Sequence, residues 1–229
     1  KKHLIDHNLF DRPLHIISAN LHSVMNSVYG PKVLAAQIGK KGRMETFASL
    51  SEPSGKKNRD AIKKYALQHG MQELKDQSGT NIDVQVFDTS KTSFEHVGFC
   101  EDRFRESDNN NKPVLIVMDY AFGEQAYETL DELLKPYKPT NAEPKLMNIK
   151  SVSIMGKAGI LEGEKGDIMV PDAHVFEGTA DNYPFKNRLS KKDLATEGLS
   201  VVSGSMVTVL GTSLQNKDVL EYFYNSSWR

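Results

Sequence analysis

Residues 152–182 read VSIMGKAGILEGEKGDIMVPDAHVFEGTADN and carry more information about fold and function than the rest of the chain. The stretch opens with an apolar strand that runs into a turn of small residues, Gly156-Lys157-Ala158-Gly159. A second strand at residues 167–170 leads into a polar segment that ends at Asn182. Small residues at the end of a strand allow a ring or another backbone to approach closely. This order of elements predicts a sheet with room for a flat ligand at its edge.

The residues before this stretch predict a β-α-β unit. Residues 114–118 (VLIVM) form the most apolar run of the chain, which is typical of a central parallel strand. Residues 124–134 then repeat apolar side chains at helical spacing. A connector at 138–145, with Pro139 and Pro144, leads to the strand at Val152. Strand, helix and strand with one connector indicate that the sheet is largely parallel here.

Further elements follow from periodicity. Short apolar or alternating runs predict strands at 14–19, 82–87 and 199–210. Helical spacing predicts helices at 58–77, ended by Gly79, and at 216–224. No linker is long enough to divide the chain. We therefore expect an α/β fold, a single domain over residues 1–229 with a mixed, largely parallel central sheet flanked by helices.

Composition limits the function classes. The chain has 229 residues and a formal net charge of −1, which predicts neither a nucleic-acid partner nor a membrane partner. Cys100 is the single cysteine, so no internal disulfide forms and a reducing compartment fits. No apolar run approaches the roughly 20 residues of a membrane span, and no secretory signal opens the sequence. A cytoplasmic protein is expected.

Two turns are candidates for ligand binding. In the first, the buried strand at 114–118 feeds a helix through Phe122-Gly123-Glu124, where backbone N–H groups can hold an anion or a hydroxyl. An ordinary strand-to-helix turn explains this segment equally well. In the second, Gly156, Ala158 and Gly159 can admit a ring, although tight packing between strands is the alternative. We expect both turns at the carboxyl ends of neighbouring strands, which favours a shared site.

Two later segments could complete such a site. Residues 176–185 (FEGTADNYPF) offer aromatic rings for stacking and polar groups for the nitrogens of a base, although a surface loop with an aromatic plug explains them equally well. In Ser203-Gly204-Ser205-Met206, a glycine within an apolar strand marks a bulge or the approach of a ligand. His15 and His22 have no carboxylate or serine companion nearby in the sequence.

Taken in order, these segments resemble the nucleoside phosphorylase and nucleosidase superfamily, which includes purine nucleoside phosphorylases, methylthioadenosine nucleosidases and AMP nucleosidases. Members have a strand ending in a Gly-Ser-Ala-Gly-like turn, which Gly156-Lys157-Ala158-Gly159 matches. A Val-Gly-Asp-Ile-Val-hydrophobic-Pro segment follows in the family, and residues 165–171 (KGDIMVP) match it closely. The family's Ser-Gly-Asp element is matched in part by Ser203-Gly204-Ser205. The resemblance covers about residues 114–228 and implies a nucleoside phosphorylase-like fold.

Three departures qualify what the resemblance implies. Ser205 stands where the family often has an Asp that assists the leaving base, and a hydroxyl is a poor general acid near neutral pH. The family's Met-Glu segment is expected just beyond Arg229, so we expect a chain that is truncated at its C-terminus. The phosphorylase Gly-Asp-Pro-x-Arg element is absent, since residues 14–20 read LHIISAN. Together with Glu124 at the helix start, this favours water over phosphate as the nucleophile.

The resemblance thus implies cleavage of the N-glycosidic bond of a purine nucleoside or nucleotide, in purine metabolism, by a hydrolase or a phosphate-dependent glycosyltransferase. It implies a homo-oligomer without a cofactor or a metal, and phosphate stays the second choice of nucleophile. Glu124, Asp181 and Ser205 are the candidate catalytic residues. The candidate substrate-binding residues are Phe122, Gly123, Gly156, Ala158, Gly159, Phe176, Glu177, Asn182, Tyr183, Phe185, Ser203 and Met206. The alternatives are a catalytically weak nucleoside-binding or sensing domain of the same fold, and an assembly scaffold.

Overall fold

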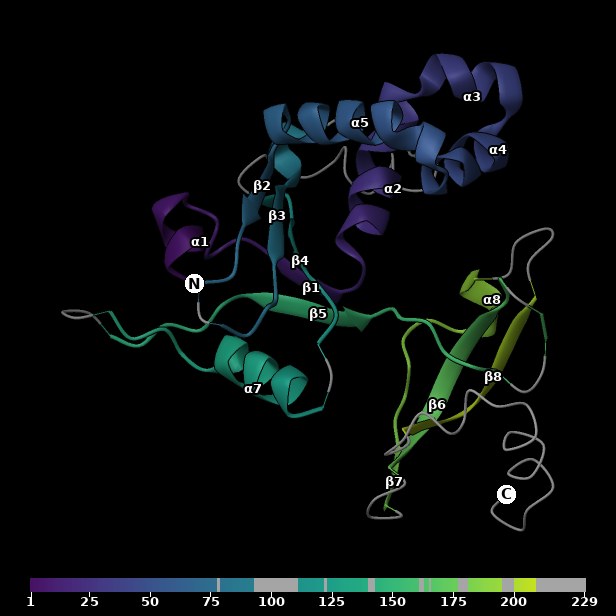
Figure 1. Ribbon diagram of the computed structural model, residues 1–229. Helices are drawn as coiled ribbons and strands as arrows, with labels where there is room; N and C mark the ends of the chain where they lie inside the picture. The colour runs from purple at the N-terminus through teal and green to yellow at the C-terminus, as the bar shows by residue number, and fades with distance from the viewer. Residues whose placement is uncertain are drawn as a thin grey trace, which may run out of the picture. The chain divides into compact units, whose positions relative to one another are not determined.

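The computed structural model describes residues 1–77, 79–92, 111–121, 123–139, 143–160, 163–164, 166–176, 181–194 and 200–208. The chain divides into two compact units, Lys1–Gly156 and Lys157–Arg229. Each unit combines helices and strands, which confirms the α/β class (Figure 1). The single domain over residues 1–229 stays a prediction.

The first unit contains a five-stranded sheet in the order β2-β3-β4-β1-β5. Its strands are β1 (Leu14–Ser18), β2 (Met71–Leu74), β3 (Val84–Asp88), β4 (Val114–Met118) and β5 (Ile149–Ile154). β1 pairs in parallel with both β4 and β5, whereas β3 pairs antiparallel with β2 and β4. The strands predicted at 14–19, 82–87, 114–118 and around Val152 are present. The sheet is mixed as predicted but less parallel, because β2 and β3 add two antiparallel pairings.

Helices cover both faces of this sheet, and Figure 1 shows α7 on one side with α2 and α5 on the other. The helices of the unit are α1 (Lys2–Asp6), α2 (Leu21–Val33), α3 (Ala35–Lys41), α4 (Arg43–Ala48), α5 (Lys56–Gln68) and α7 (Gly123–Leu134), with short 3-10 turns at Ser49–Ser51, Pro53–Gly55 and Thr89–Lys91. On one face, Leu14, Ile16 and Val114 form a core with α1, and α7 packs against it. On the other face, Val117 and Phe87 pack against α2 and α5. The alternation of side chains along each strand produces these two cores.

The helix predicted over 58–77 is wrong beyond Gln68. α5 ends there, and Gly70 follows with φ +98°, a left-handed conformation that favours glycine. A Cβ at Gly70 would lie 2.6 Å from the carbonyl oxygen of Asp88, so the close approach also requires glycine. Residues 71–74 then pair with β3 as the strand β2. The glycine that ends the helix is therefore Gly70 and not Gly79.

The second unit contains a three-stranded sheet in the order β7-β6-β8, with β6 (Ile168–Phe176), β7 (Asp181–Pro184) and β8 (Val201–Thr208), and a short helix α8 (Lys191–Leu194). β6 pairs antiparallel with β7 and in parallel with β8. Val170, Ala173 and Val201 are its buried apolar residues among those described. The strands predicted at 167–170 and 199–210 are confirmed, the first being longer than expected. The helix predicted at 216–224 lies outside the described residues.

Across the described ranges of both units, no helix is long and apolar enough to cross a membrane.

Candidate functional site

The carboxyl ends of β1 and β4 form the part of the first sheet most suited to bind a ligand. The two strands are parallel neighbours. β1 leads into α2 and β4 leads into α7, and these helices pack on opposite faces of the sheet. In open α/β sheets, ligands bind outside the carboxyl ends of strands at a point where the following connections diverge in this way.

Backbone hydrogen bonds hold the three parallel strand ends together. The Ala19 amide donates to the carbonyl of Met118 at 3.0 Å, and the Met155 amide donates to the carbonyl of Ser18 at 2.9 Å. Asn20 then caps α2, because its side-chain oxygen accepts from the amides of His22 and Ser23 at 3.0 and 3.3 Å. Two amides in the first turn of α2 are therefore already hydrogen-bonded within the chain.

Both predicted turns of the first unit lie at this edge. Gly123 begins α7 after β4, and Gly156 follows β5. They are not on neighbouring strands as predicted, because β1 lies between β4 and β5. The β4 and β5 ends are therefore about 10 Å apart, twice the usual spacing of strands. Phe122 and the side chain of Glu124 lie outside the described residues.

The glycines of the second turn are not explained by packing in the described residues. A Cβ built on Gly156 or on Gly159 would meet no described atom within 4 Å. The tight packing between strands that was the alternative explanation is therefore not seen here. Lys157, Ala158 and Gly159 belong to the second unit, and all three are exposed.

Asp119 is a polar residue at this edge that the sequence analysis did not single out. It follows β4 directly, and its amide donates to the carbonyl of Asp83 at 3.0 Å. Its carboxylate accepts from the amide of Tyr120 at 2.9 Å. The neighbouring Asp83 forms an ion pair with Lys75. The hydrogen bond from Lys75, and secondly the hydrogen bond from the amide of Asp76, lower the pKa of Asp83. The sequence signal that could have identified Asp119 is its position directly after a buried strand.

His15 has the serine companion that the local sequence did not reveal. β1 and β5 pair so that His15 lies opposite Ser151, and the Nδ1 atom of His15 is 2.7 Å from the Oγ atom of Ser151. Burial, and secondly the charge of Lys150, lower the pKa of His15. The imidazole is therefore neutral at pH 7, and its Nδ1 atom can donate a hydrogen bond to the hydroxyl or accept one from it, depending on the tautomer. The two residues are 136 positions apart, so only the strand pairing shows the contact.

The predicted residues of the second unit divide between the two faces of its sheet. Tyr183 and Met206 both lie opposite His174, and Phe176 shares that face because it is two residues further along β6. Asn182 lies opposite Val175 on the other face, where Ser205 lies opposite Ala173 and Ser203 opposite Val170. One ligand on one face cannot contact both groups.

The first of these faces carries the aromatic side chains and a histidine contact. The Nε2 atom of His174 lies 2.6 Å from the Oγ1 atom of Thr208. Phe185 follows β7, and its amide donates to the carbonyl of Asp172 at 3.0 Å. The bulge expected near Gly204 occurs on the adjoining strand, where the register shifts between Pro171 and Ala173. Glu177 and the side chain of Asp181 lie outside the described residues.

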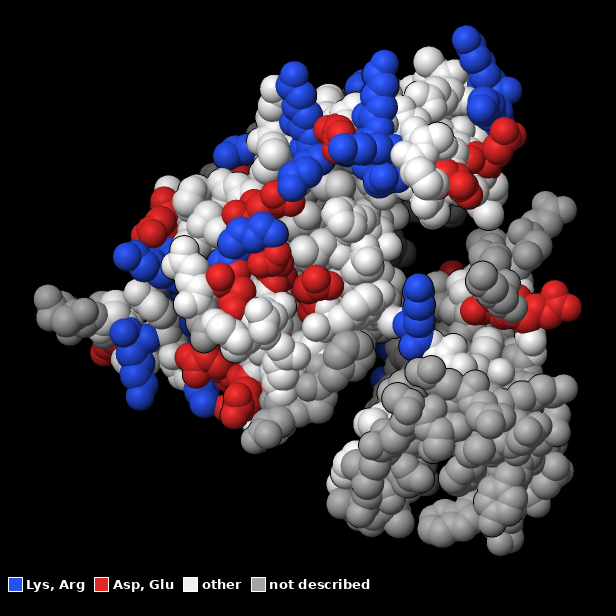
Figure 2. All heavy atoms as spheres, in the orientation of Figure 1, with Lys and Arg blue, Asp and Glu red and all other residues white. Residues whose placement is uncertain are grey.

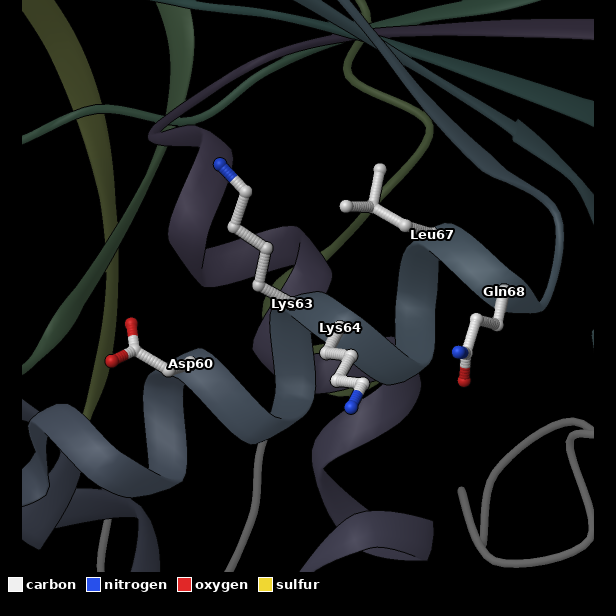
Figure 3. A pocket seen from close by; sticks show the side chains of 5 residues that line it. All are labelled: Asp60, Lys63, Lys64, Leu67 and Gln68. Carbon is white, nitrogen blue, oxygen red and sulfur yellow. The ribbon is translucent and has the colours of Figure 1, made fainter.

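Other parts of the described chain are weaker candidates. A shallow hollow on α5 is lined by Asp60, Lys63, Lys64, Leu67 and Gln68. Figure 3 shows that these side chains leave one helix in different directions and do not converge. Among the described residues, no group of three or more His, Cys, Asp or Glu side chains could hold a metal ion.

Comparison with known proteins places the chain in a family. Residues 45–229 match the family described as "Family of unknown function (DUF6909)". The chain belongs to this family. The matched range includes β4, α7, β5 and the second unit, whereas β1 and α2 lie before it. No curated protein and no solved structure matches the chain.

Proposed function

We propose that this chain cleaves the N-glycosidic bond of a purine nucleoside or nucleotide, with water as the favoured nucleophile. The observation that carries the proposal is the position of Gly123 and Gly156 at one edge of the sheet, on either side of β1. In the sequence, the strand, glycine turn and helix at residues 114–125 and the turn Gly156-Lys157-Ala158-Gly159 resemble the corresponding elements of the nucleoside phosphorylase superfamily. The proposal includes the nucleoside phosphorylase-like fold, a cytoplasmic location, a homo-oligomer and no cofactor.

The chemistry assigns roles to the candidate residues. Cleavage passes through a sugar with oxocarbenium character, as in glycoside hydrolysis, so a carboxylate close to the sugar stabilises it. Glu124 in the first turn of α7 is proposed to orient water or a sugar hydroxyl, and Asp119 is a second acid at the same edge. Within the second unit, Phe185 or Tyr183 is proposed to stack on the base and Asp181 to bond its nitrogens, whereas Asn182 is left out because it lies on the opposite face from Tyr183.

Water is favoured over phosphate as the nucleophile because this edge of the sheet has few groups that would bind an anion. Helix N-termini at such a point commonly bind phosphate through free amides. Here the side chain of Asn20 already accepts from two amides of α2, and Glu124 follows the first residue of α7. The carboxylate of Asp119 adds a negative charge at the end of β4. These three features disfavour the binding of phosphate at this edge of the sheet.

The second candidate function is a nucleoside-binding or sensing domain with weak catalysis. Ser205 favours it, because this residue stands in place of an acid and is exposed on β8. A binder of this kind would raise its melting temperature with a nucleoside and release no free base.

Replacing Phe185 with Ala is expected to lower the rate of base release from purine nucleosides about tenfold, because stacking of a base on an aromatic ring is worth about 1–3 kcal/mol. Phe185 is 42% exposed, so the substitution should leave the fold intact. Leu189→Ala is the matched control, since Leu189 is 51% exposed in the same unit and has no proposed role. Initial rates of free-base release, measured by chromatography, check the expectation. Rates for both variants within about twofold of wild type would remove Phe185 from the proposed site.

A further inference from the structure

Basic side chains gather on the helical layer formed by α3, α4 and α5. Residues 32–64 hold nine Lys or Arg residues and three Asp or Glu residues, so this segment has a formal charge of +6 in a chain of −1. The rest of the chain therefore has a charge of −7. Figure 2 shows the blue side chains standing off the surface over these helices. The near-zero net charge of the whole chain hides this separation of charge.

Packing between two helices joins lysines from separate parts of the sequence. The side-chain amides of Gln37 in α3 and Asn58 in α5 bond each other reciprocally at 3.0 and 3.1 Å. Lys40 and Lys41 lie one helical turn after Gln37, and Lys57 directly precedes Asn58. Lys64 is two turns after Lys57, on the same exposed face of α5. We name Lys40, Lys56, Lys57 and Lys64 the lysine surface.

These four lysines are not used within the described structure. Other basic residues nearby have internal partners: Arg59 donates to the carbonyls of Leu50 and Glu52, and Lys63 pairs with Glu73 at 2.8 Å. The four members of the lysine surface are exposed and form no ion pair with a described residue. Their charge is therefore available to a partner.

The same helical layer carries two exposed apolar side chains. Met44 in α4 is 80% exposed and Leu67 in α5 is 47% exposed. Leu67 lies three residues after Lys64 in α5, so the two residues are neighbours on the helix surface, although Figure 3 shows their side chains leaving the helix in different directions. Lysines that can extend to lipid headgroups beside apolar side chains that can enter the layer below are the usual make-up of a peripheral membrane surface.

We propose that the lysine surface, with Met44 and Leu67, binds an anionic lipid bilayer. Binding to an anionic bilayer requires diffuse positive charge and a small apolar anchor, and the helical layer carries both. A single-stranded nucleic acid is a poorer fit, because such sites combine positive charge with exposed aromatic rings. The aromatic ring of α5, Tyr65, instead stacks on His69 with centroids 3.7 Å apart and meets the edge of Tyr29. The net charge of the whole chain predicts no membrane partner, so this proposal departs from that prediction.

The test is co-sedimentation of the full chain with vesicles of phosphatidylcholine alone and of phosphatidylcholine with about one-third phosphatidylserine. The wild-type chain should bind the anionic vesicles and not the neutral ones, and raising the salt from about 0.05 to 0.5 M should release it. The variant with Lys40→Glu, Lys57→Glu and Lys64→Glu should bind at least about tenfold more weakly.

A matched control separates the surface from net charge. Lys186→Glu, Lys191→Glu and Lys192→Glu change three exposed lysines of the second unit and alter the net charge equally. This control should bind like the wild type. Equal losses in both triple variants, no binding of the wild type to anionic vesicles, or binding of an RNA oligonucleotide without binding of vesicles would each overturn the proposal. Because the salt response uses the wild-type chain, the proposal is testable even if a variant folds poorly.

Discussion

Replacing Arg12 with Met is expected to lower the free energy of unfolding by about 3–5 kcal/mol, the usual cost of breaking a buried ion pair by removing one partner. The guanidinium of Arg12 donates to Oδ1 of Asp88 at 2.7 Å, and both side chains are only 10% exposed. It also donates to the carbonyls of Lys112 and Pro113. The substitution would therefore leave the buried carboxylate without its closest cation, since only the exposed Lys91 would remain, 3.5 Å from Oδ2. The carbonyl of Lys112 would lose the Arg12 donor, and the carbonyl of Pro113 would keep only the hydroxyl of Thr89.

The pH dependence of this effect has a definite sign. Burial alone would raise the pKa of Asp88, but hydrogen bonds from Ser90 and Arg12 outweigh it and lower that pKa. A carboxyl with a lowered pKa in the folded state contributes stability above its unfolded pKa of about 4 and loses it as the pH falls through the folded value. The difference between wild type and Arg12→Met should therefore be largest near neutral pH and shrink below about pH 4.

Urea unfolding of both proteins between neutral and acid pH measures this difference. Lys145→Met is the matched control, because Lys145 pairs with Asp11 at 2.6 Å but both side chains are exposed. Such surface pairs contribute less than about 1 kcal/mol. If Arg12→Met cost no more than Lys145→Met, the buried pair would not hold the fold as described.

Replacing Tyr29 with Ala is expected to cost about 3–5 kcal/mol of unfolding free energy, as for other large aromatic side chains in a core. Tyr29 is buried, and its ring stacks on Phe87 with centroids 5.9 Å apart and meets Tyr65 at 6.1 Å. It thereby joins α2, α5 and β3 in one core. Removal of the ring would leave a cavity where these three elements meet.

The hydroxyl of Tyr29 makes a separate contribution. It donates to the carbonyl of His69 at 3.1 Å and lies 3.2 Å from Oγ1 of Thr92. Burial raises the pKa of Tyr29 to about 12, so the hydroxyl stays protonated over the physiological range. Tyr29→Phe removes this group alone and should cost about 1–2 kcal/mol. Thermal or urea unfolding of both variants tests the order, and an equal cost for Phe and Ala would show that the ring does not fill the core.

Local periodicity was sufficient to predict the positions of most strands but not which strands pair with one another. The apolar run at β4 correctly predicts a central strand. At β5, the last strand of the sheet in the part of the chain that the structure describes, the apolar residues Val152 and Ile154 are exposed. The position of β1 between β4 and β5 depends on pairings between residues about 100 or more positions apart. No local pattern contains that information.

The candidate site shows the same limit. The strand ends that carry Gly123 and Gly156 follow from local pattern, and their common edge follows from parallel pairing. The contact of His15 with Ser151 requires the fold. One error was avoidable: Asn182 and Tyr183 are consecutive residues of a strand, as are Ser205 and Met206, so the pleat puts the members of each pair on opposite faces.

The most direct test of the proposed function is to incubate the full chain with adenosine, AMP, methylthioadenosine, inosine and uridine, with and without phosphate, and to separate the free bases by chromatography. We expect release of a purine base without phosphate and no release of uracil. Release that requires phosphate would contradict the choice of water. No base released from any compound under either condition would contradict cleavage of the N-glycosidic bond.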